Sequence, residues 1–331
     1  MPKQAVLLLA HGTPETVEQI PEYLRNVVGG HPLPLAVVEE IQRRYSLIGR
    51  SPLTEITLEQ RRLVEVELAA GGQPVPVYVA MRNWRPYIAD VVRQMRADGV
   101  QEAAVVCMAP QNSRTSVGLY RRAVETEAAG LRIDFTEAWA LHPLLIEAFA
   151  ERLRPALARL SAEAAHAVPV LFTAHSVPCR TLQTPAASSA PNRELDAQSN
   201  LWPEAGADPY AQEAKRTAAL VAERVPGISH WFFAFQSQGV SGGPWIGPAV
   251  EETLDALAAE GVRTLLLQPI GFLCDHVEIL YDVDILFRGY AAKLGIRLER
   301  AESLNASPTL ARAVADLARQ GLARLQDPPA K

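Results

Sequence analysis

Short apolar runs alternate along this chain with longer segments in which apolar and polar positions recur at helical spacing. The apolar runs predict strands at residues 5–10, 75–81, 103–109, 132–138, 168–173, 230–235, 263–269 and 296–300. The longer segments predict helices at 54–70, 86–98, 115–129, 143–160, 208–224, 248–260, 277–294 and 308–325. Because most of these runs are unbroken apolar stretches separated by helices, the pattern predicts an α/β fold with parallel, doubly wound sheets.

The two halves of the chain repeat each other. VLLLAHGTP (6–14) and PVLFTAHSVP (169–178) each end an apolar run at a histidine, and His11 and His175 lie 164 positions apart. GVQEAAVVCMAP, from Gly99, and GVRTLLLQPIGF, from Gly261, match at an offset of 162. Such long offsets indicate a duplicated domain, although strand ends of one fold class also resemble one another. We therefore predict two similar domains, 1–160 and 161–331, with the last helix available to pack on the N-terminal half.

Composition and charge narrow the class of protein. The 331 residues are 48% hydrophobic and 21% charged, which is enough for two sizeable cores. The net charge of -5 and the pI near 5.9 argue against a nucleic-acid partner. No apolar run approaches the roughly 18 residues of a membrane span. The N-terminus lacks a signal-peptide pattern, so we expect a cytoplasmic protein without stable membrane insertion.

Several kinds of cofactor are not indicated. The three cysteines, Cys107, Cys179 and Cys274, are scattered and odd in number, which argues against a disulfide framework and an iron–sulfur cluster. The glycine-rich loops GxGxxG and GxxxxGKS/T do not occur, so no nucleotide cofactor is expected. Residues 183–207 are rich in proline and alanine and predict a surface loop.

Candidate chemistry gathers where predicted strands end, because doubly wound sheets bind ligands beyond the carboxyl ends of their strands. The residues at these ends are His11, Pro110, His175, Gln236 and Gly271. A histidine at a strand end is more often structural than catalytic. Paired with a carboxylate, however, an imidazole forms a weak site for a divalent first-row metal and can move protons near neutral pH.

Carboxylates are densest in GFLCDHVEILYDVD, residues 271–284. If a helix begins near Asp275, then Asp275, Glu278 and Asp282 share one face and His276 points elsewhere. Such a stripe also occurs on helices that only face solvent, where acids near the N-terminus favour the helix dipole. No cluster offers the four ligands of a tight structural zinc site.

The chain as a whole resembles the ferrochelatases, enzymes that insert ferrous iron into a porphyrin. The resemblance rests on LLAHGTP (8–14), GRSPLTEITLEQ (49–60), AMRNWRPYI (80–88), TAHSVP (173–178), DPY (208–210), FQSQG (235–239), PWIGP (244–248) and PIGFLCDHVEILYDVD (269–284). It implies two similar Rossmann-like domains with parallel sheets and an active-site cleft between them. It also implies that His175 and Glu278 are the catalytic pair for protons and metal, with Asp282 as a further metal residue.

The resemblance implies a set of porphyrin-binding positions as well: His11, Arg44, Tyr45, Ser51, Tyr120 and Trp245. For two of them an ordinary structural role stays open, since Trp245 between prolines could serve packing and Arg44 could lie on a solvated helix face. Similar soluble enzymes have a tyrosine where this chain has His11, and basic residues where it has VVGGHP. We expect His11 to ligate iron in the product, on the porphyrin face opposite His175.

The segment from Glu22 to Leu53 is short and polar, and it resembles the lip of soluble members that act on coproporphyrin III. We therefore expect a monomeric lyase of haem biosynthesis that acts on coproporphyrin III. Its partners are the porphyrin and ferrous iron, both substrates, and no prosthetic group is expected. The alternatives are a protoporphyrin IX ferrochelatase, a sirohydrochlorin cobaltochelatase and a non-catalytic porphyrin- or metal-binding protein.

Overall fold

The computed structural model describes residues 2–179, 208–239 and 244–326. The surface loop predicted at 183–207 lies outside these residues. The chain folds into two compact units. Unit 1 comprises Met1–Pro110, Ser116–Trp139 and Asn305–Lys331, and unit 2 comprises Gln111–Thr115 and Ala140–Leu304.

The sheet of unit 1 has four parallel strands in the order β2-β1-β3-β4. These strands are β1 (Gln4–Ala10), β2 (Val77–Met81), β3 (Glu102–Cys107) and β4 (Arg132–Thr136). Each lies where an apolar run predicted it. The central strands are buried on both faces, which explains why their sequences are apolar without alternation.

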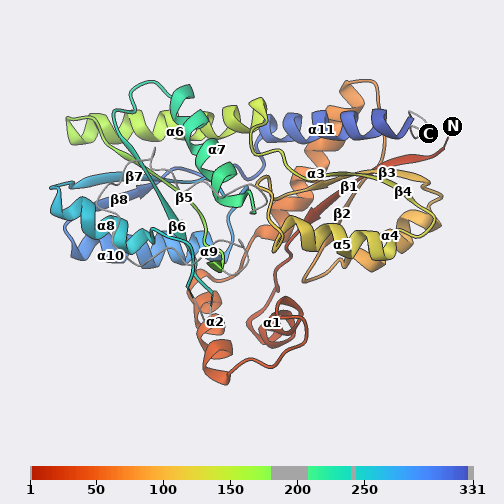
Figure 1. Cartoon of the computed structure of the whole chain (residues 1–331), viewed down its shortest axis with the longest axis horizontal. Helices are drawn as coiled ribbons and strands as arrows, with labels where there is room; N and C mark the ends of the chain where they lie inside the picture. The colour runs from red at the N-terminus through yellow and green to blue at the C-terminus, as the bar shows by residue number, and fades with distance from the viewer. Residues whose placement is uncertain (1, 180–207, 240–243, 327–331) are drawn as a thin grey trace. The chain divides into compact units, whose positions relative to one another are not determined.

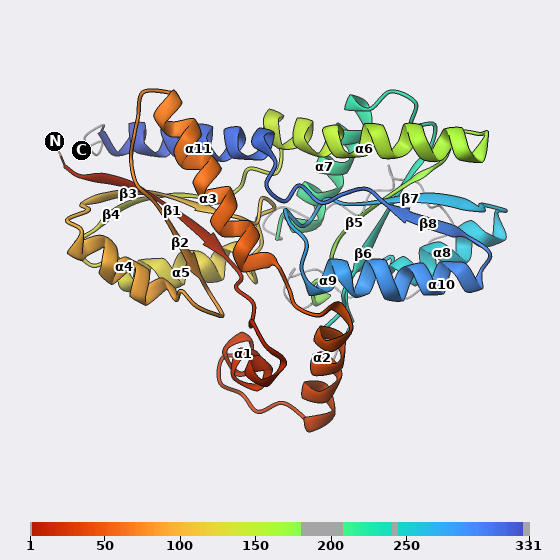
Figure 2. The ribbon, with the colours of Figure 1, turned by 180° about the vertical axis from the view of Figure 1, so that it is seen from behind.

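Helices cover both faces of this sheet (Figures 1 and 2). Leu7 and Leu9 of β1 share an apolar core with residues of α4 (Ile88–Ala97) and α5 (Val117–Glu127). The opposite face is covered by α3 (Leu53–Ala70) and by α11 (Pro308–Gln326), which contacts β3 and β4. Gly321 permits this approach of α11, because a Cβ there would lie 2.9 Å from the Cβ of Ala104.

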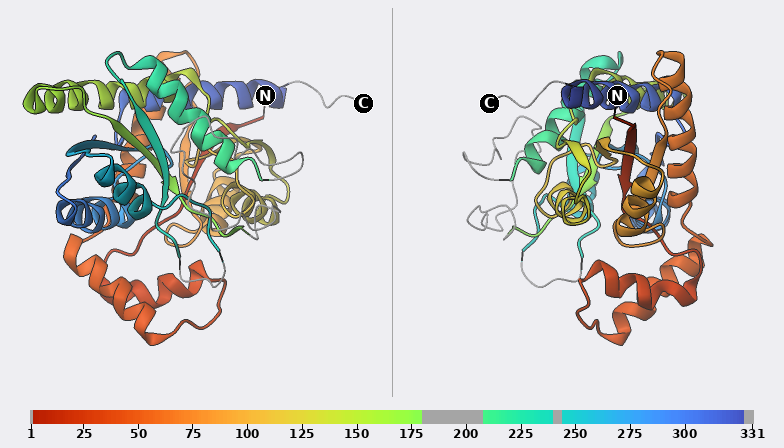
Figure 3. Two further views of the ribbon diagram at one scale, coloured as in Figure 1. Left: turned by 60° about the vertical axis from the view of Figure 1, so that its left-hand side comes forward. Right: turned by 90° about the vertical axis from the view of Figure 1, so that its right-hand side faces the viewer.

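Two helices of unit 1 were not among the predicted ones. They follow β1 and are α1 (Ile20–Val27) and α2 (Leu35–Ile48), which contact each other (Figure 3). The glycines and prolines of this region read as loop signals, although Pro21 occupies the first turn of α1, where proline is tolerated. Leu35 and Leu47 of α2 are 71% and 54% exposed, so the segment predicted to be polar carries apolar surface.

Unit 2 repeats the topology of unit 1 in the strand order β6-β5-β7-β8, again fully parallel. Its strands are β5 (Val170–His175), β6 (Trp231–Gln236), β7 (Thr264–Pro269) and β8 (Arg297–Arg300). One face is covered by α6 (Pro143–Ala164) and α7 (Tyr210–Arg224), and the other by α8 (Val250–Ala259) and α10 (Arg288–Lys293) (Figure 1). The prediction of two similar Rossmann-like domains with parallel sheets is confirmed.

The compact units do not divide at a single boundary near residue 160. The whole of α6 belongs to unit 2, because it packs on α7 and β7. The last helix, α11, belongs to unit 1, because it packs on α3, β3 and β4. Across the described ranges, no helix is both long and apolar enough to cross a membrane.

The single helix predicted at 277–294 is wrong. The structure has a short α9 (Val277–Leu280), a π-helical turn at Asp282–Phe287 and then α10. The carbonyl oxygen of Tyr281 accepts hydrogen bonds from the amides of both Ile285 and Leu286, at 3.1 and 2.9 Å. This widened turn interrupts the α-helical pattern, and π-turns of this kind often occur at functional sites.

Candidate active site

His175 and Glu278 form an ion pair at the carboxyl edge of the unit 2 sheet. His175 is the last residue of β5 and Glu278 lies in α9, with 3.4 Å between Nε2 of the imidazole and Oε1 of the carboxylate. Their side chains are 32% and 33% exposed. The pair is therefore held by the fold and still open to a substrate.

The fold brings these two residues together through close backbone contacts. The turn after β7 lies directly on the end of β5, because a Cβ on Gly271 would lie 2.9 Å from Cα of Ala174. Gln236, at the end of β6, donates a hydrogen bond from its side-chain amide to the carbonyl oxygen of Glu278 at 3.0 Å. Glycine in the GFL sequence is thus a steric requirement of the site.

Each member of the pair changes the pKa of the other. Burial alone would lower the pKa of His175, but the facing Glu278 carboxylate outweighs it, and the pKa is raised above 6.5. Burial would raise the pKa of Glu278, but the imidazole of His175 and then that of His276 hold it well below 4.5. The pair therefore favours a protonated imidazole beside an ionised carboxylate, which suits a group that accepts protons.

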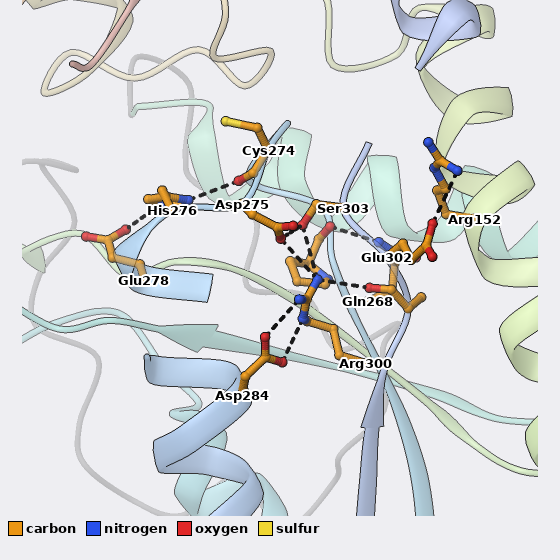
Figure 4. Close-up of polar contacts among 12 residues, drawn as sticks. Arg152, Gln268, Cys274, Asp275, His276, Glu278, Asp284, Arg300, Glu302 and Ser303 are labelled. Atoms are coloured by element: carbon orange, nitrogen blue, oxygen red, sulfur yellow. Dashed lines mark hydrogen bonds and ion pairs between the residues drawn. The ribbon is translucent and has the colours of Figure 1, made fainter. Parts of the chain in front are cut away.

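His276 also faces Glu278, so the prediction that it points elsewhere is wrong. Its Nε2 lies 3.5 Å from Oε2 of Glu278, and its Nδ1 lies 3.0 Å from the carbonyl oxygen of Cys274 (Figure 4). The reason is that the helix begins at Val277 and not near Asp275, as the stripe of carboxylates required, with His276 as its N-cap in extended conformation. Glu278 consequently lies between two imidazoles.

The predicted stripe of three carboxylates is likewise wrong for Asp275. This residue precedes α9, and its carboxylate accepts hydrogen bonds from Ser303 and Arg300 instead of facing Glu278. Asp282 is only 3% exposed and accepts a hydrogen bond from the hydroxyl of Ser237. Its charge also contributes to the raised pKa of His175. Glu278 and Asp282 are thus the acids associated with His175.

Aromatic rings surround His175. The ring centroid of Trp245 lies 6.4 Å away and that of Phe272 lies 6.2 Å away. Trp245 also forms an isolated antiparallel bridge with Pro178. These rings give the imidazole an apolar border, and contact of Trp245 with a porphyrin stays a prediction.

In unit 1, the equivalent strand end carries His11. Nε2 of His11 lies 2.9 Å from the hydroxyl of Tyr23 and 3.1 Å from the amide nitrogen of Asn83. The next residue, Gly12, has φ +83°, and a Cβ there would lie 2.8 Å from Cβ of Trp84. A left-handed, crowded turn therefore fixes the direction of the His11 side chain.

The remaining predicted porphyrin residues also lie in unit 1, in different surroundings. The hydroxyl of Tyr45 lies 2.9 Å from that of Thr13, so α2 is tied to the turn that follows β1. Arg44 forms an ion pair with Glu40, with 2.9 Å between Nε and Oε1, and the side chain of Arg44 is 31% exposed. Ser51 is 8% exposed, and its hydroxyl has no hydrogen-bond partner among the residues described.

Tyr120 lies in the apolar core between the unit 1 sheet and its helices, and it is 4% exposed. The guanidinium of Arg82 lies 5.4 Å from its ring centroid. Burial raises the pKa of its hydroxyl. The structure gives Tyr120 a packing role, and its contact with a porphyrin stays a prediction.

Some residues of the site had no assignment from the sequence. Ser237 adopts φ +61°, which is unusual for a residue other than glycine and places its hydroxyl against Asp282. Tyr23 and Asn83, which contact His11, come from α1 and from the turn after β2. The quoted segments FQSQG and AMRNW contain Ser237 and Asn83, but sequence gives no direction for their side chains.

The residues could hold a metal ion only weakly. Within the ranges that the structure describes, no three His, Cys, Asp or Glu side chains are arranged as a metal-binding cluster. The cysteines Cys107, Cys179 and Cys274 are buried and free. One imidazole and one carboxylate suit a metal that must be passed on rather than retained.

Comparison with known proteins shows the family of this chain. A family model described as Ferrochelatase matches residues 3–322. A ferrochelatase of Acidobacterium capsulatum is 58% identical over 98% of this chain and 96% of its own length. A coproporphyrin III ferrochelatase of Mycolicibacterium vanbaalenii is 35% identical over 96% of this chain and 89% of its own length.

A solved structure shares the fold at low sequence identity. It is a sirohydrochlorin chelatase from Bacillus subtilis subspecies spizizenii in complex with cobalt, 13% identical, with a TM-score of 0.53. The match covers 96% of this chain and 95% of that one. The family model and the close relatives, rather than this likeness of fold, decide the family. This chain belongs to the ferrochelatase family.

Proposed function

We propose that this chain inserts ferrous iron into coproporphyrin III, with His175 and Glu278 as its catalytic residues. The observation that carries the proposal is the ion pair between Nε2 of His175 and Oε1 of Glu278, at 3.4 Å. The choice of porphyrin is supported by the relative named coproporphyrin III ferrochelatase, at 35% identity.

The reaction requires a proton acceptor and weak ligands for iron. Two pyrrole N–H bonds break, two protons leave, and Fe²⁺ forms bonds to the four ring nitrogens, so charge is balanced without an oxidant or reductant. His175 accepts the two protons one after the other and passes each to solvent, since its side chain is 32% exposed. The carboxylate of Glu278 stabilises the imidazolium that forms each time. Glu278 and Asp282 supply oxygen ligands that release iron to the macrocycle.

The other proposed roles concern binding. Trp245 borders His175, and the macrocycle packs against its ring. His11 ligates the iron of the product, because an imidazole is a good ligand for haem iron. Arg44, Tyr45, Ser51 and Tyr120 complete the proposed porphyrin contacts. The protein acts in the cytoplasm as a monomer. Size-exclusion chromatography with light scattering tests the monomeric state.

Anaerobic turnover decides the substrate. Purified protein receives Fe²⁺ with coproporphyrin III, protoporphyrin IX or sirohydrochlorin in parallel, and the absorption of each porphyrin is followed. The highest kcat/KM is expected with coproporphyrin III. A preference for protoporphyrin IX would replace the proposed substrate, and equal rates with and without protein for every porphyrin would overturn the proposed activity.

A further inference from the structure

We propose that Arg300 is a positioning residue for iron insertion, which fastens both ends of the segment Asp275–Asp284 and so orients Glu278. This inference rests on the proposed function of Glu278. Arg300 is the last residue of β8. Its guanidinium pairs with the carboxylates of Asp275 and Asp284 and not with His175 or Glu278. Its action is therefore through Asp275 and Asp284.

The stronger contact is with Asp284, in the π-helical turn. Nε of Arg300 donates to one carboxylate oxygen and Nη2 donates to the other, both at 2.8 Å. Such a two-point contact between planar groups fixes orientation as well as distance. Asp284 lies two residues after Asp282, so this contact fastens the C-terminal end of the segment to β8.

The second contact is with Asp275, at the other end of the segment. Nη1 of Arg300 lies 3.2 Å from Oδ1 of Asp275, and the hydroxyl of Ser303 donates to the same oxygen at 2.7 Å. Figure 4 shows the guanidinium of Arg300 between the carboxylates of Asp275 and Asp284. One buried cation thus holds two carboxylates that are nine residues apart in sequence.

These contacts are shielded from water. The side chain of Arg300 is 13% exposed, and those of Asp275 and Asp284 are 20% and 21% exposed. Charge pairs with this degree of burial are little screened by salt, and loss of one member leaves the other charges buried without compensation. The clamp formed by Arg300, Asp275 and Asp284 therefore has a defined geometry.

The clamp is connected to the catalytic pair through His276. Asp275 immediately precedes His276, whose Nε2 lies 3.5 Å from Oε2 of Glu278. Glu278 and Asp282 lie between the two fastened ends, where the change from α9 to the π-helical turn interrupts regular helical hydrogen bonding. The backbone hydrogen bonds inside this segment are local turns, so its position on the unit 2 sheet depends on contacts with other elements.

The clamp also divides the acids of this segment into two groups. Asp275 and Asp284 are occupied by Arg300, whereas Glu278 and Asp282 face His175 and Ser237. Because Asp275 and Asp284 pair with Arg300, their carboxylates are not available as ligands for iron. Iron meets two acids rather than four, which agrees with a site that must release its metal.

The test compares Arg300→Gln and Arg300→Lys with the same substitutions at Arg297. Arg297 lies on the same strand, is 48% exposed and forms ion pairs with Glu163 and Glu299. Three properties are measured for each protein: hydrogen exchange of residues 275–287, the Kd for Co²⁺ by titration calorimetry, and kcat and KM for Fe²⁺ insertion into coproporphyrin III. Asp284→Asn serves as a second variant, because it removes the two-point contact and leaves Arg300 beside Asp275.

Loss of the clamp is expected to act on kcat and metal binding, because residues that orient metal ligands typically change activity or affinity about 10- to 100-fold. For Arg300→Gln and Asp284→Asn we expect kcat to fall by about that factor, with KM for the porphyrin within about threefold of wild type. Exchange at 275–287 and the Kd for Co²⁺ should both rise, and lysine at 300 should restore part of each. The Arg297 variants should resemble wild type.

Unchanged exchange at 275–287 together with an unchanged Kd for Co²⁺ in Arg300→Gln and Asp284→Asn would overturn the inference. An equal effect of the Arg297 variants would overturn it as well, because it would indicate general loss of stability. Failure of the proposed function is distinguishable, since wild-type protein would then lack turnover while exchange and Co²⁺ binding still report on the clamp.

Discussion

Replacement of Glu278 by glutamine removes the charge that faces His175 and keeps the size of the side chain. At the 3.4 Å that separates Nε2 from Oε1, the attraction between unit charges is about 1 kcal/mol in water and about 5 kcal/mol at an effective dielectric constant of 20. Both side chains are one third exposed, so the true value lies between these limits. Since about 1.4 kcal/mol is a factor of ten in rate, kcat should fall between about fivefold and a few thousandfold.

The pH dependence of turnover should change in a defined direction. Burial lowers the pKa of His175 and the Glu278 carboxylate raises it, with a net increase above 6.5. Wild-type turnover requires neutral His175, so it should fall as the pH drops through a midpoint above 6.5. In Glu278→Gln burial is retained and the main opposing charge is lost, so the midpoint should move to lower pH.

The assay is anaerobic iron insertion measured from pH 5.5 to 9, with porphyrin affinity measured by fluorescence quenching. Glu302→Gln is a matched control, because Glu302 is 81% exposed and its carboxylate pairs with Arg152. Retention of more than about a fifth of wild-type turnover by Glu278→Gln would refute a central role for this residue. An unmoved midpoint would refute its electrostatic coupling to His175.

Three further outcomes are expected. His175→Ala should abolish insertion with porphyrin affinity largely kept, as checked by turnover and fluorescence titration, whereas parallel loss of both would indicate a binding role. His11→Ala should change the absorption and resonance Raman spectra of the bound iron porphyrin, and identical coordination and spin state would leave His11 a turn residue. Gly12→Ala should lower the free energy of unfolding by roughly 2 kcal/mol or more, because φ is +83° and a Cβ would lie 2.8 Å from Cβ of Trp84. Gly130→Ala, at φ +80° in open space, should lose only about 1 kcal/mol, and equal losses in urea denaturation would refute the steric argument.

Most strands were predictable from the sequence because buried parallel strands carry apolar runs, whereas the edge strands β4 and β8 alternate apolar with charged residues. Each predicted strand lies within two residues of an observed one at both ends. The helices α1 and α2 were not predicted, because prolines and glycines around them signal loops and their stability comes from packing. The interruption of 277–294 was also not predicted, because an i to i+5 hydrogen bond has no distinctive residue signature.

The site was predictable in part. The duplicated strand ends placed His11 and His175 at equivalent positions. His175 lies beside Glu278 in the structure, whereas the catalytic role that the resemblance implies for the pair stays a prediction. The directions of Asp275 and His276 could not be predicted from helical spacing, since both residues precede α9 and His276 has an extended backbone. The partners of Asp275 come from β8 and the residues after it, far along the chain.

The place of α11 has a consequence for synthesis of the protein on the ribosome. This helix buries Leu310, Val314 and Leu322 within unit 1, whose other strands and helices are all encoded before residue 140. At roughly 5–20 residues per second, the nascent unit 1 must wait about ten seconds or more for its last helix while unit 2 is translated. During that interval one face of β3 and β4 lacks its cover, and this apolar surface is a natural target for chaperones that bind emerging chains.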